Sequence, residues 1–157
     1  MKKIVILRGV PGAGKTTAAK QLFVEQGLAG VPVVSVSADY FFERDGVYRF
    51  DGSKLGEAHG ACLRSFLRHL QQIADGLPMI LVVDNTSLTV MEMITYVRLA
   101  QAFGVPFEVL TVECDPAIAA ARGLHSVPVA KVFEMHRRMK EAKLPRDWPH
   151  IIKQAGI

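Results

Sequence analysis

The stretch that decides the fold lies near the N-terminus and consists of Gly9-Val10-Pro11-Gly12-Ala13-Gly14-Lys15-Thr16. An apolar run at 4–7 precedes it and a segment of helical periodicity follows it, so the order is strand, glycine-rich turn, helix. Glycines let the backbone turn so that successive N–H groups point inward, and the helix N-terminus adds its partial positive charge. The complete G-x-x-x-x-G-K-[ST] pattern predicts a cradle for a di- or triphosphate. We expect Lys15 to reach the β- and γ-phosphates, Thr16 to ligate Mg²⁺, and Thr17 to complete the nucleotide contacts.

The rest of the chain alternates short apolar runs with longer segments of helical periodicity. Strands are predicted at about 4–7, 33–36, 79–83 and 107–112, and helices at about 15–26, 54–74, 90–103, 116–122 and 128–142. This alternation predicts a three-layer α/β fold with a parallel sheet of about four to five strands. The tail 144–157, which contains Pro145 and Pro149, is expected to be irregular. With 157 residues, 50% of them hydrophobic, we expect one domain over 1–157.

Composition excludes several other classes of protein. Cys62 and Cys114 are the two cysteines, too few and too isolated for a disulfide framework or a zinc cluster, so we expect a cytoplasmic protein. The apolar run after Met1 is too short for a signal peptide, and no segment is long enough to span a membrane. The net charge of +4 favours phosphate-bearing partners but is too small to indicate a dedicated nucleic-acid-coating protein.

Two aspartates follow predicted strands, at the sheet edge where open α/β sheets bind ligands. Asp39 comes after the second strand and Asp84 after the third. If the first three strands are neighbours, both carboxylates face the γ-phosphate, where one accepts a proton and the other holds Mg²⁺. The alternatives are a turn cap for Asp84 and a solvated loop residue for Asp39.

Six motifs follow one another along the chain. They are the run 9–16, Ser37-Ala38-Asp39 with the aromatic residues after it, Asp45-Gly46-Val47-Tyr48-Arg49-Phe50-Asp51, Leu55-Gly56-Glu57-Ala58-His59, Val83-Asp84-Asn85-Thr86 and the run 121–128, ARGLHSVP. Together they resemble the polynucleotide-kinase-like P-loop kinases, which include the 5′-hydroxyl kinase module of bacteriophage polynucleotide kinase and small stand-alone ATP-binding relatives. The resemblance spans about residues 3–140. It implies a P-loop kinase fold with a helical lid at about 122–142.

The resemblance also implies roles for individual residues. Asp39 becomes the general base for the acceptor hydroxyl, and Arg122 becomes a lid arginine that contacts the ATP phosphates, so that Lys15, Asp39 and Arg122 form the catalytic set. Arg138 is expected to be a second phosphate ligand, and Thr16 and Asp84 are expected to hold Mg²⁺. The alternative for Arg122 is a solvated residue at a helix C-terminus. Basic residues gather beside the expected phosphate site: Arg137, Arg138, Lys140, Lys143 and Arg146.

The sequence departs from the family pattern just after Asp39. The phage-type enzyme has an acceptor-side arginine at the place where this chain has Phe42, and Arg44 or Arg49 is the candidate replacement. The leading hypothesis is an ATP- and Mg²⁺-dependent kinase that phosphorylates a hydroxyl, with a nucleic-acid 5′-end as the first candidate acceptor. The alternatives are a kinase for a nucleoside, sugar or antibiotic, and a nucleotide-binding switch or adaptor with slow hydrolysis.

Overall fold

The computed structural model describes residues 1–155 and contains a five-stranded sheet with the strand order β2-β5-β1-β6-β7. The strands are β1 (Lys2–Arg8), β2 (Val33–Val36), β5 (Met79–Asp84), β6 (Phe107–Glu113) and β7 (His150–Gln154), and every neighbouring pair is parallel. The central strand β1 is buried from Ile4 to Arg8, because a parallel strand covered on both faces needs apolar side chains on both. The predicted α/β class with a parallel sheet is confirmed.

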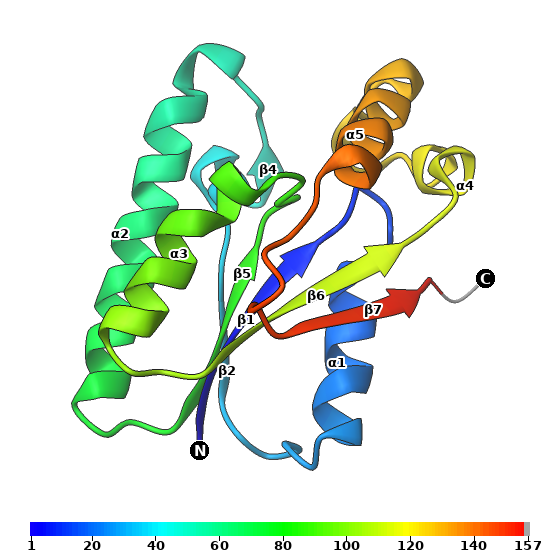
Figure 1. Ribbon diagram of the computed structural model, residues 1–157. Coiled ribbons are helices and arrows are strands. Elements are labelled where there is room, and N and C mark those ends of the chain that lie inside the picture. Colours follow the sequence, from blue (N-terminus) through cyan, green and yellow to red (C-terminus); the bar gives the residue numbers. More distant parts are fainter. Residues whose placement is uncertain (156–157) are drawn as a thin grey trace.

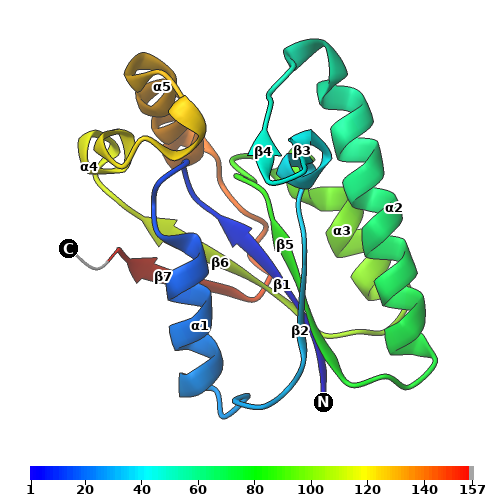
Figure 2. The same cartoon turned by 180° about the vertical axis from the view of Figure 1, so that it is seen from behind.

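Helices cover both faces of this sheet (Figures 1 and 2). They are α1 (Lys15–Glu25), α2 (Leu55–Ala74), α3 (Val90–Ala102), α4 (Pro116–Ala121) and α5 (Val129–Glu141). The helices α2 and α3 lie on one face and α1 on the other, while α4 and α5 lie beyond the carboxyl ends of the strands. The buried residues of α2 recur every three or four positions, as an amphipathic helix requires: Ala58, Cys62, Phe66, Leu70 and Ile73.

The sheet separates two apolar cores. One core joins the sheet to α2 and α3 and includes Phe66, Met93 and Trp148. The other joins it to α1 and α5 and includes Phe23 and Met139. Since Val132 and Met139 of α5 belong to the second core, the helix proposed as a lid is anchored to the domain by its own apolar side chains.

Two features of the fold differ from the sequence-based expectation. The tail is not irregular throughout, because residues 150–154 form β7 beside β6; residues 156–157 lie outside the described part. Pro149 does not prevent this pairing, since its carbonyl still accepts a hydrogen bond from Val109 N. A short antiparallel hairpin that was not predicted, β3 (Glu43–Arg44) and β4 (Val47–Tyr48), follows β2.

Among the helices of residues 1–155, none combines the length and apolar character that a membrane crossing requires.

Candidate active site

The glycine-rich loop joins β1 to α1, and its shape depends on two left-handed glycines. Gly12 has φ +81°, and a Cβ built on it would overlap the carbonyl oxygen of Ala119 in α4. Gly14 has φ +88° and is the N-cap residue of α1. Only glycine allows both a left-handed backbone and so close a contact with the Ala119 carbonyl. The loop is therefore packed against α4 at the N-terminus of α1. The first-turn amides of α1 lack partners within the helix and are free to bind anions.

Lys15 is folded onto this loop. Its Nζ donates hydrogen bonds to the carbonyls of Gly9 at 3.1 Å and Val10 at 3.2 Å. Burial lowers the pKa of Lys15, while the carboxylates of Asp84 and Asp39 act in the opposite direction. A buried ammonium with neutral acceptors and nearby carboxylates is poised to exchange its carbonyl partners for phosphate oxygens.

The two predicted aspartates lie at the same edge of the sheet, because β2 and β5 are paired neighbours. Val36 of β2 is opposite Val83 of β5, so Asp39 and Asp84 come after adjacent positions. Burial raises the pKa of Asp84; the charge of Lys15 lowers it and that of Asp39 raises it further. The condition that we set for their meeting, that the first three strands are neighbours, is met by the order β2-β5-β1.

The segment that carries Asp39 is fixed by hydrogen bonds from both sides. Its own backbone N–H donates to Ser37 Oγ at 3.1 Å, and the N–H of Ala38 donates to Asn85 Oδ1 at 2.9 Å. Asn85 follows β5 and also donates to Cys62 Sγ of α2 at 3.7 Å. Asn85 therefore ties the ends of two strands and a helix together beneath Asp39, a role that the sequence analysis did not assign to it.

Two further residues contact the Asp39 carboxylate. Tyr48 of β4 donates its hydroxyl to Oδ1 at 3.3 Å, and His125 Nε2, from the segment between α4 and α5, lies 3.8 Å from Oδ2. The two rings stack on each other with centroids 3.8 Å apart. Burial, followed by the charge and hydrogen bond of Asp39, raises the pKa of Tyr48 to about 12, so that its hydroxyl remains a donor at neutral pH. Tyr48 and His125 belong to two of the six sequence motifs described above, but only the folded chain shows that both contact Asp39.

Arg122 follows α4 as its C-cap residue, and its side chain reaches back to the glycine-rich loop. Its Nη1 donates to the Gly12 carbonyl at 2.7 Å, and the same atom lies 3.4 Å from a Cβ built on Gly14. The guanidinium therefore lies on the loop, where an arginine expected to contact ATP phosphates needs to be.

Other predicted residues are less closely connected to the loop. Within residues 1–155 the Arg138 side chain forms no hydrogen bond or ion pair, and the same holds for Arg44 and Arg49 of the hairpin segment. Phe42 is buried and packs against Phe41, Tyr48 and Phe50. The position of the missing acceptor-side arginine is thus part of the apolar core, and the assignment of Arg138 stays a prediction.

Two oxygen donors are available for a magnesium ion. Thr16 offers a hydroxyl in the first turn of α1 and Asp84 a half-buried carboxylate at the end of β5. Within the described part of the chain no group of three or more His, Cys, Asp or Glu side chains gathers around a possible metal position. Mg²⁺ is commonly held by one or two protein oxygens together with water and substrate phosphates. The residues present fit Mg²⁺ bound with a nucleotide.

A glycine-rich loop at the end of the central strand, with α4 and α5 beyond the carboxyl ends of the strands (Figure 1), defines the class of P-loop α/β domains. The AAA domain family (AAA_33) matches residues 4–142, and the chain belongs to this family. The narrower relation to polynucleotide kinases stays a prediction.

Comparison with individual proteins agrees with this placement. Human NEDD4-binding protein 2 is 34% identical over 142 residues, a match that covers 84% of this chain and 7% of that protein. A chain from the Pnkp1/Rnl/Hen1 RNA repair complex superimposes with a TM-score of 0.65 at 14% identity, covering 88% of this chain and 44% of that one. A gluconokinase from Sinorhizobium meliloti 1021 gives a TM-score of 0.55 at 12% identity, covering 99% and 84%. The structural likenesses establish the fold, and this chain spans only about 7% of the length of the human relative.

Proposed function

We propose that this chain is an ATP- and Mg²⁺-dependent phosphotransferase whose acceptor is a hydroxyl group. The observation that carries the proposal is the arrangement at one sheet edge: Lys15 and Arg122 contact the phosphate-binding loop, and Asp39 follows β2, the outer neighbour of β5. Positive groups on the loop and a carboxylate beside it are what in-line transfer from a triphosphate to an alcohol needs.

The donor nucleotide would be held by the loop and by two cations. The first-turn amides of α1 and Lys15 bind the β- and γ-phosphates, and Arg122 neutralises charge that develops on the transferred group. Thr16 and Asp84 would hold Mg²⁺, which supplies further neutralisation of the phosphate oxygens. A pocket of about 240 Å³ beside Arg122, lined also by Cys114, Ile118 and Ala155, is where we place the nucleobase.

Asp39 acts as the general base. As the acceptor oxygen bonds to the γ-phosphorus, the bond from that phosphorus to the bridging oxygen breaks, ADP leaves, and the acceptor proton passes to Asp39. Tyr48 and Ser37 keep the carboxylate and its backbone in place. His125 approaches the carboxylate from the segment between α4 and α5, so movement of the lid changes the surroundings of the base.

A nucleic-acid 5′-hydroxyl is the first candidate acceptor. Its support is the order of motifs shared with polynucleotide-kinase-like proteins, together with Tyr40 and Phe50, which are 49% and 59% exposed on the hairpin side and offer faces for base stacking. A small hydroxyl compound is the second candidate. It is favoured by Phe42, a buried aromatic residue at the position where the phage-type enzyme has its acceptor-side arginine.

A labelling experiment separates these candidates. The protein is incubated with Mg²⁺, γ-labelled ATP and either 5′-hydroxyl oligonucleotides or a set of nucleosides, sugars and aminoglycosides, with Lys15→Ala as the inactive control. Label on the oligonucleotide 5′-end supports the first candidate, and label on a small compound alone supports the second. Slow release of phosphate with no labelled acceptor would contradict the transferase proposal and favour a nucleotide-dependent switch.

A further inference from the structure

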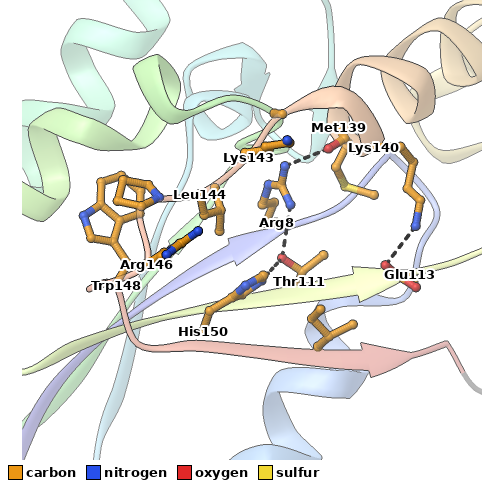
Figure 3. Close-up of a pocket in the computed structure, with 13 residues that line it drawn as sticks. Arg8, Thr111, Glu113, Met139, Lys140, Lys143, Leu144, Arg146, Trp148 and His150 are labelled. Atoms are coloured by element: carbon orange, nitrogen blue, oxygen red, sulfur yellow. Dashed lines mark hydrogen bonds and ion pairs between the residues drawn. The ribbon is translucent and has the colours of Figure 1, made fainter.

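A second pocket, of about 420 Å³, shares only Glu113 with the pocket proposed above for the nucleobase. It is bounded by the ends of β1, β6 and β7 and by the segment 142–148 that leads from α5 to β7 (Figure 3). Four basic side chains line it: Arg8, Lys140, Lys143 and Arg146. It shares no lining residue with the glycine-rich loop, and it contains neither Asp39 nor Arg122.

Arg8 is the unusual member of this pocket because its charge is buried without a carboxylate partner. Only 5% of the residue is exposed. Its guanidinium donates to the carbonyls of Ser87 at 3.1 Å, Leu88 at 2.8 Å and Met139 at 2.9 Å, and more weakly to Thr111 Oγ1 at 3.5 Å. All four acceptors are neutral, so hydrogen bonding is satisfied while the positive charge is left uncompensated.

The carboxylate that lines the pocket is already engaged. Glu113 accepts from Lys140 Nζ at 3.1 Å and from Gln154 Nε2 at 2.9 Å, contacts that lower its pKa. Burial lowers the pKa of Arg8, and the charges of Glu92 and Glu113 oppose this only from a distance. Glu113 and Lys140 therefore offset each other, and Arg8 keeps its excess of positive charge.

Two more cations lie at the rim without a partner. Within residues 1–155 neither Lys143 nor Arg146 forms an ion pair or a side-chain hydrogen bond. His150 lines the same pocket; burial lowers its pKa, the charge of Arg8 lowers it further and that of Glu113 raises it. The pocket thus has three uncompensated positive charges.

The remaining lining is apolar. Leu144, Trp148 and Ile152 lie beside the cations, and Figure 3 shows Leu144 and Arg146 close to Trp148. A volume of about 420 Å³ is larger than a single phosphate group needs and is in the range of small-ligand pockets. A ligand that suits both parts has a multiply charged anionic group and a compact carbon body.

We propose that this basic pocket binds a phosphate monoester, with the phosphate among Arg8, Lys143 and Arg146 and the carbon body against Leu144 and Trp148. The Arg146 guanidinium, which forms no ion pair or side-chain hydrogen bond within residues 1–155, presents paired N–H donors that match phosphate oxygens, while the buried Arg8 contributes positive charge to the site. A dianion compensates several positive charges better than a carboxylate does. The site lies beyond the phosphotransferase proposed above and requires no transfer chemistry. Because Arg8 also bonds to Met139 at the end of α5, the ligand would lie against the base of the lid.

Trp148 is the single tryptophan of the chain and serves as the probe. Phenyl phosphate is titrated at constant ionic strength while the fluorescence of Trp148 is followed, in the wild type and in a Lys143→Gln/Arg146→Gln variant. We expect a saturable change whose Kd rises at least tenfold in this variant. Lys15→Ala, which weakens the phosphate loop of the active site, is expected to leave the Kd within twofold of the wild type.

A charge-matched variant is the control for general electrostatics. Lys20→Gln/Lys54→Gln removes two exposed positive charges elsewhere and is expected to leave the Kd within twofold. The proposal is overturned if the two double variants behave alike, if Lys15→Ala abolishes the signal, or if neutral phenol binds as well as phenyl phosphate. Thermal unfolding of each variant confirms that it is folded before titration.

Discussion

At the scale of the residue, the contacts of Asp39 are the part of the candidate site with the sharpest consequences. The carboxylate contacts a hydroxyl from β4, nine residues further along the chain, and an imidazole from the distant segment between α4 and α5. The pKa of Tyr48, raised to about 12, keeps its proton available to Asp39 throughout the neutral range. The orientation of the base therefore depends on side chains outside the segment after β2 that carries it.

Tyr48→Phe tests this dependence. The variant keeps a ring for stacking on His125 and removes only the hydrogen bond to Asp39, so we expect kcat for acceptor phosphorylation to fall roughly tenfold, as the loss of about 1–2 kcal/mol would give. The KM for ATP is expected to stay unchanged. Tyr48→Leu, which also removes the stack, should lower kcat further; equal kcat in Tyr48→Phe and wild type would show that the hydroxyl has no part in positioning the base.

His150 gives a pH dependence of stability with a definite sign. Its Nε2 lies 2.7 Å from Thr111 Oγ1, and its pKa in the folded protein lies below 6.5 because of burial and the charge of Arg8. Above pH 6.5 the ring is neutral in both states and contributes nothing. As the pH falls below 6.5, the unfolded chain takes up the proton first, so the free energy of unfolding decreases until the lowered pKa is passed.

We therefore expect His150→Gln to become more stable relative to the wild type as the pH falls from 8 to 5. Urea unfolding of both proteins at the two pH values measures the difference. A difference in the free energy of unfolding between the two proteins that is the same at both pH values would contradict the lowered pKa of His150.

The sequence predicts the individual residues of the site better than it predicts their partners. Asp39, Asp84 and Arg122 are candidates because they follow strands or occupy a motif, which are local features, and their roles stay predictions. Asn85 and His125 belong to quoted motifs, but their contacts join segments separated by dozens of residues. Only the strand order and the path of the lid bring those segments together, and neither is encoded in local spacing.

At the scale of the element, the packing of the glycine-rich loop on α4 is the tightest constraint. A side chain at Gly12 would displace the Ala119 carbonyl and would also hold a strained φ of +81°. This contact joins the loop to α4, which begins at Pro116 and whose C-terminal end carries Arg122 back to the loop.

Gly12→Ala is expected to destabilise the protein by about 2 kcal/mol or more and to weaken nucleotide binding. Gly27→Ala is the matched control, because Gly27 has φ +70° with open space around its Cβ position. It should cost only about 1 kcal/mol, from backbone strain alone, and leave nucleotide affinity unchanged. Thermal unfolding measures the stability of the two variants, and an ATP titration measures their nucleotide affinity. Equal losses of stability and affinity in both variants would show that the contact with α4 is unimportant.

Secondary structure was predictable where periodicity and end signals agree. The predicted strand at 33–36 matches β2, and all five predicted helices occur to within about one residue at each end. Asp115 caps α4 through the Ala117 N–H, as the Asp-Pro pair indicates. The two-residue strands of the hairpin are too short to show alternation, and the two prolines before β7, Pro145 and Pro149, favoured an irregular segment there.

At the scale of the whole molecule, the positive charge is arranged differently from the sequence-based expectation. Five basic residues of the C-terminal region were expected to gather beside the nucleotide phosphates. Arg137 instead pairs with Glu141 and Lys140 with Glu113, while Lys143 and Arg146 line the pocket below the end of α5. Successive residues of a helix point to different sides, so basic residues that are close in sequence do not all face the same site.

The central claim is that Asp39 is the base of a transfer reaction on the P-loop. The most direct measurement is acceptor-stimulated ADP release by the wild type and by Asp39→Asn, together with the Kd for ATP of both proteins. We predict that the substitution lowers the acceptor-stimulated rate by about 10²- to 10⁴-fold and leaves the Kd for ATP within about threefold. An Asp39→Asn protein that retains its stimulated rate, or a wild type that no acceptor stimulates, would contradict the account.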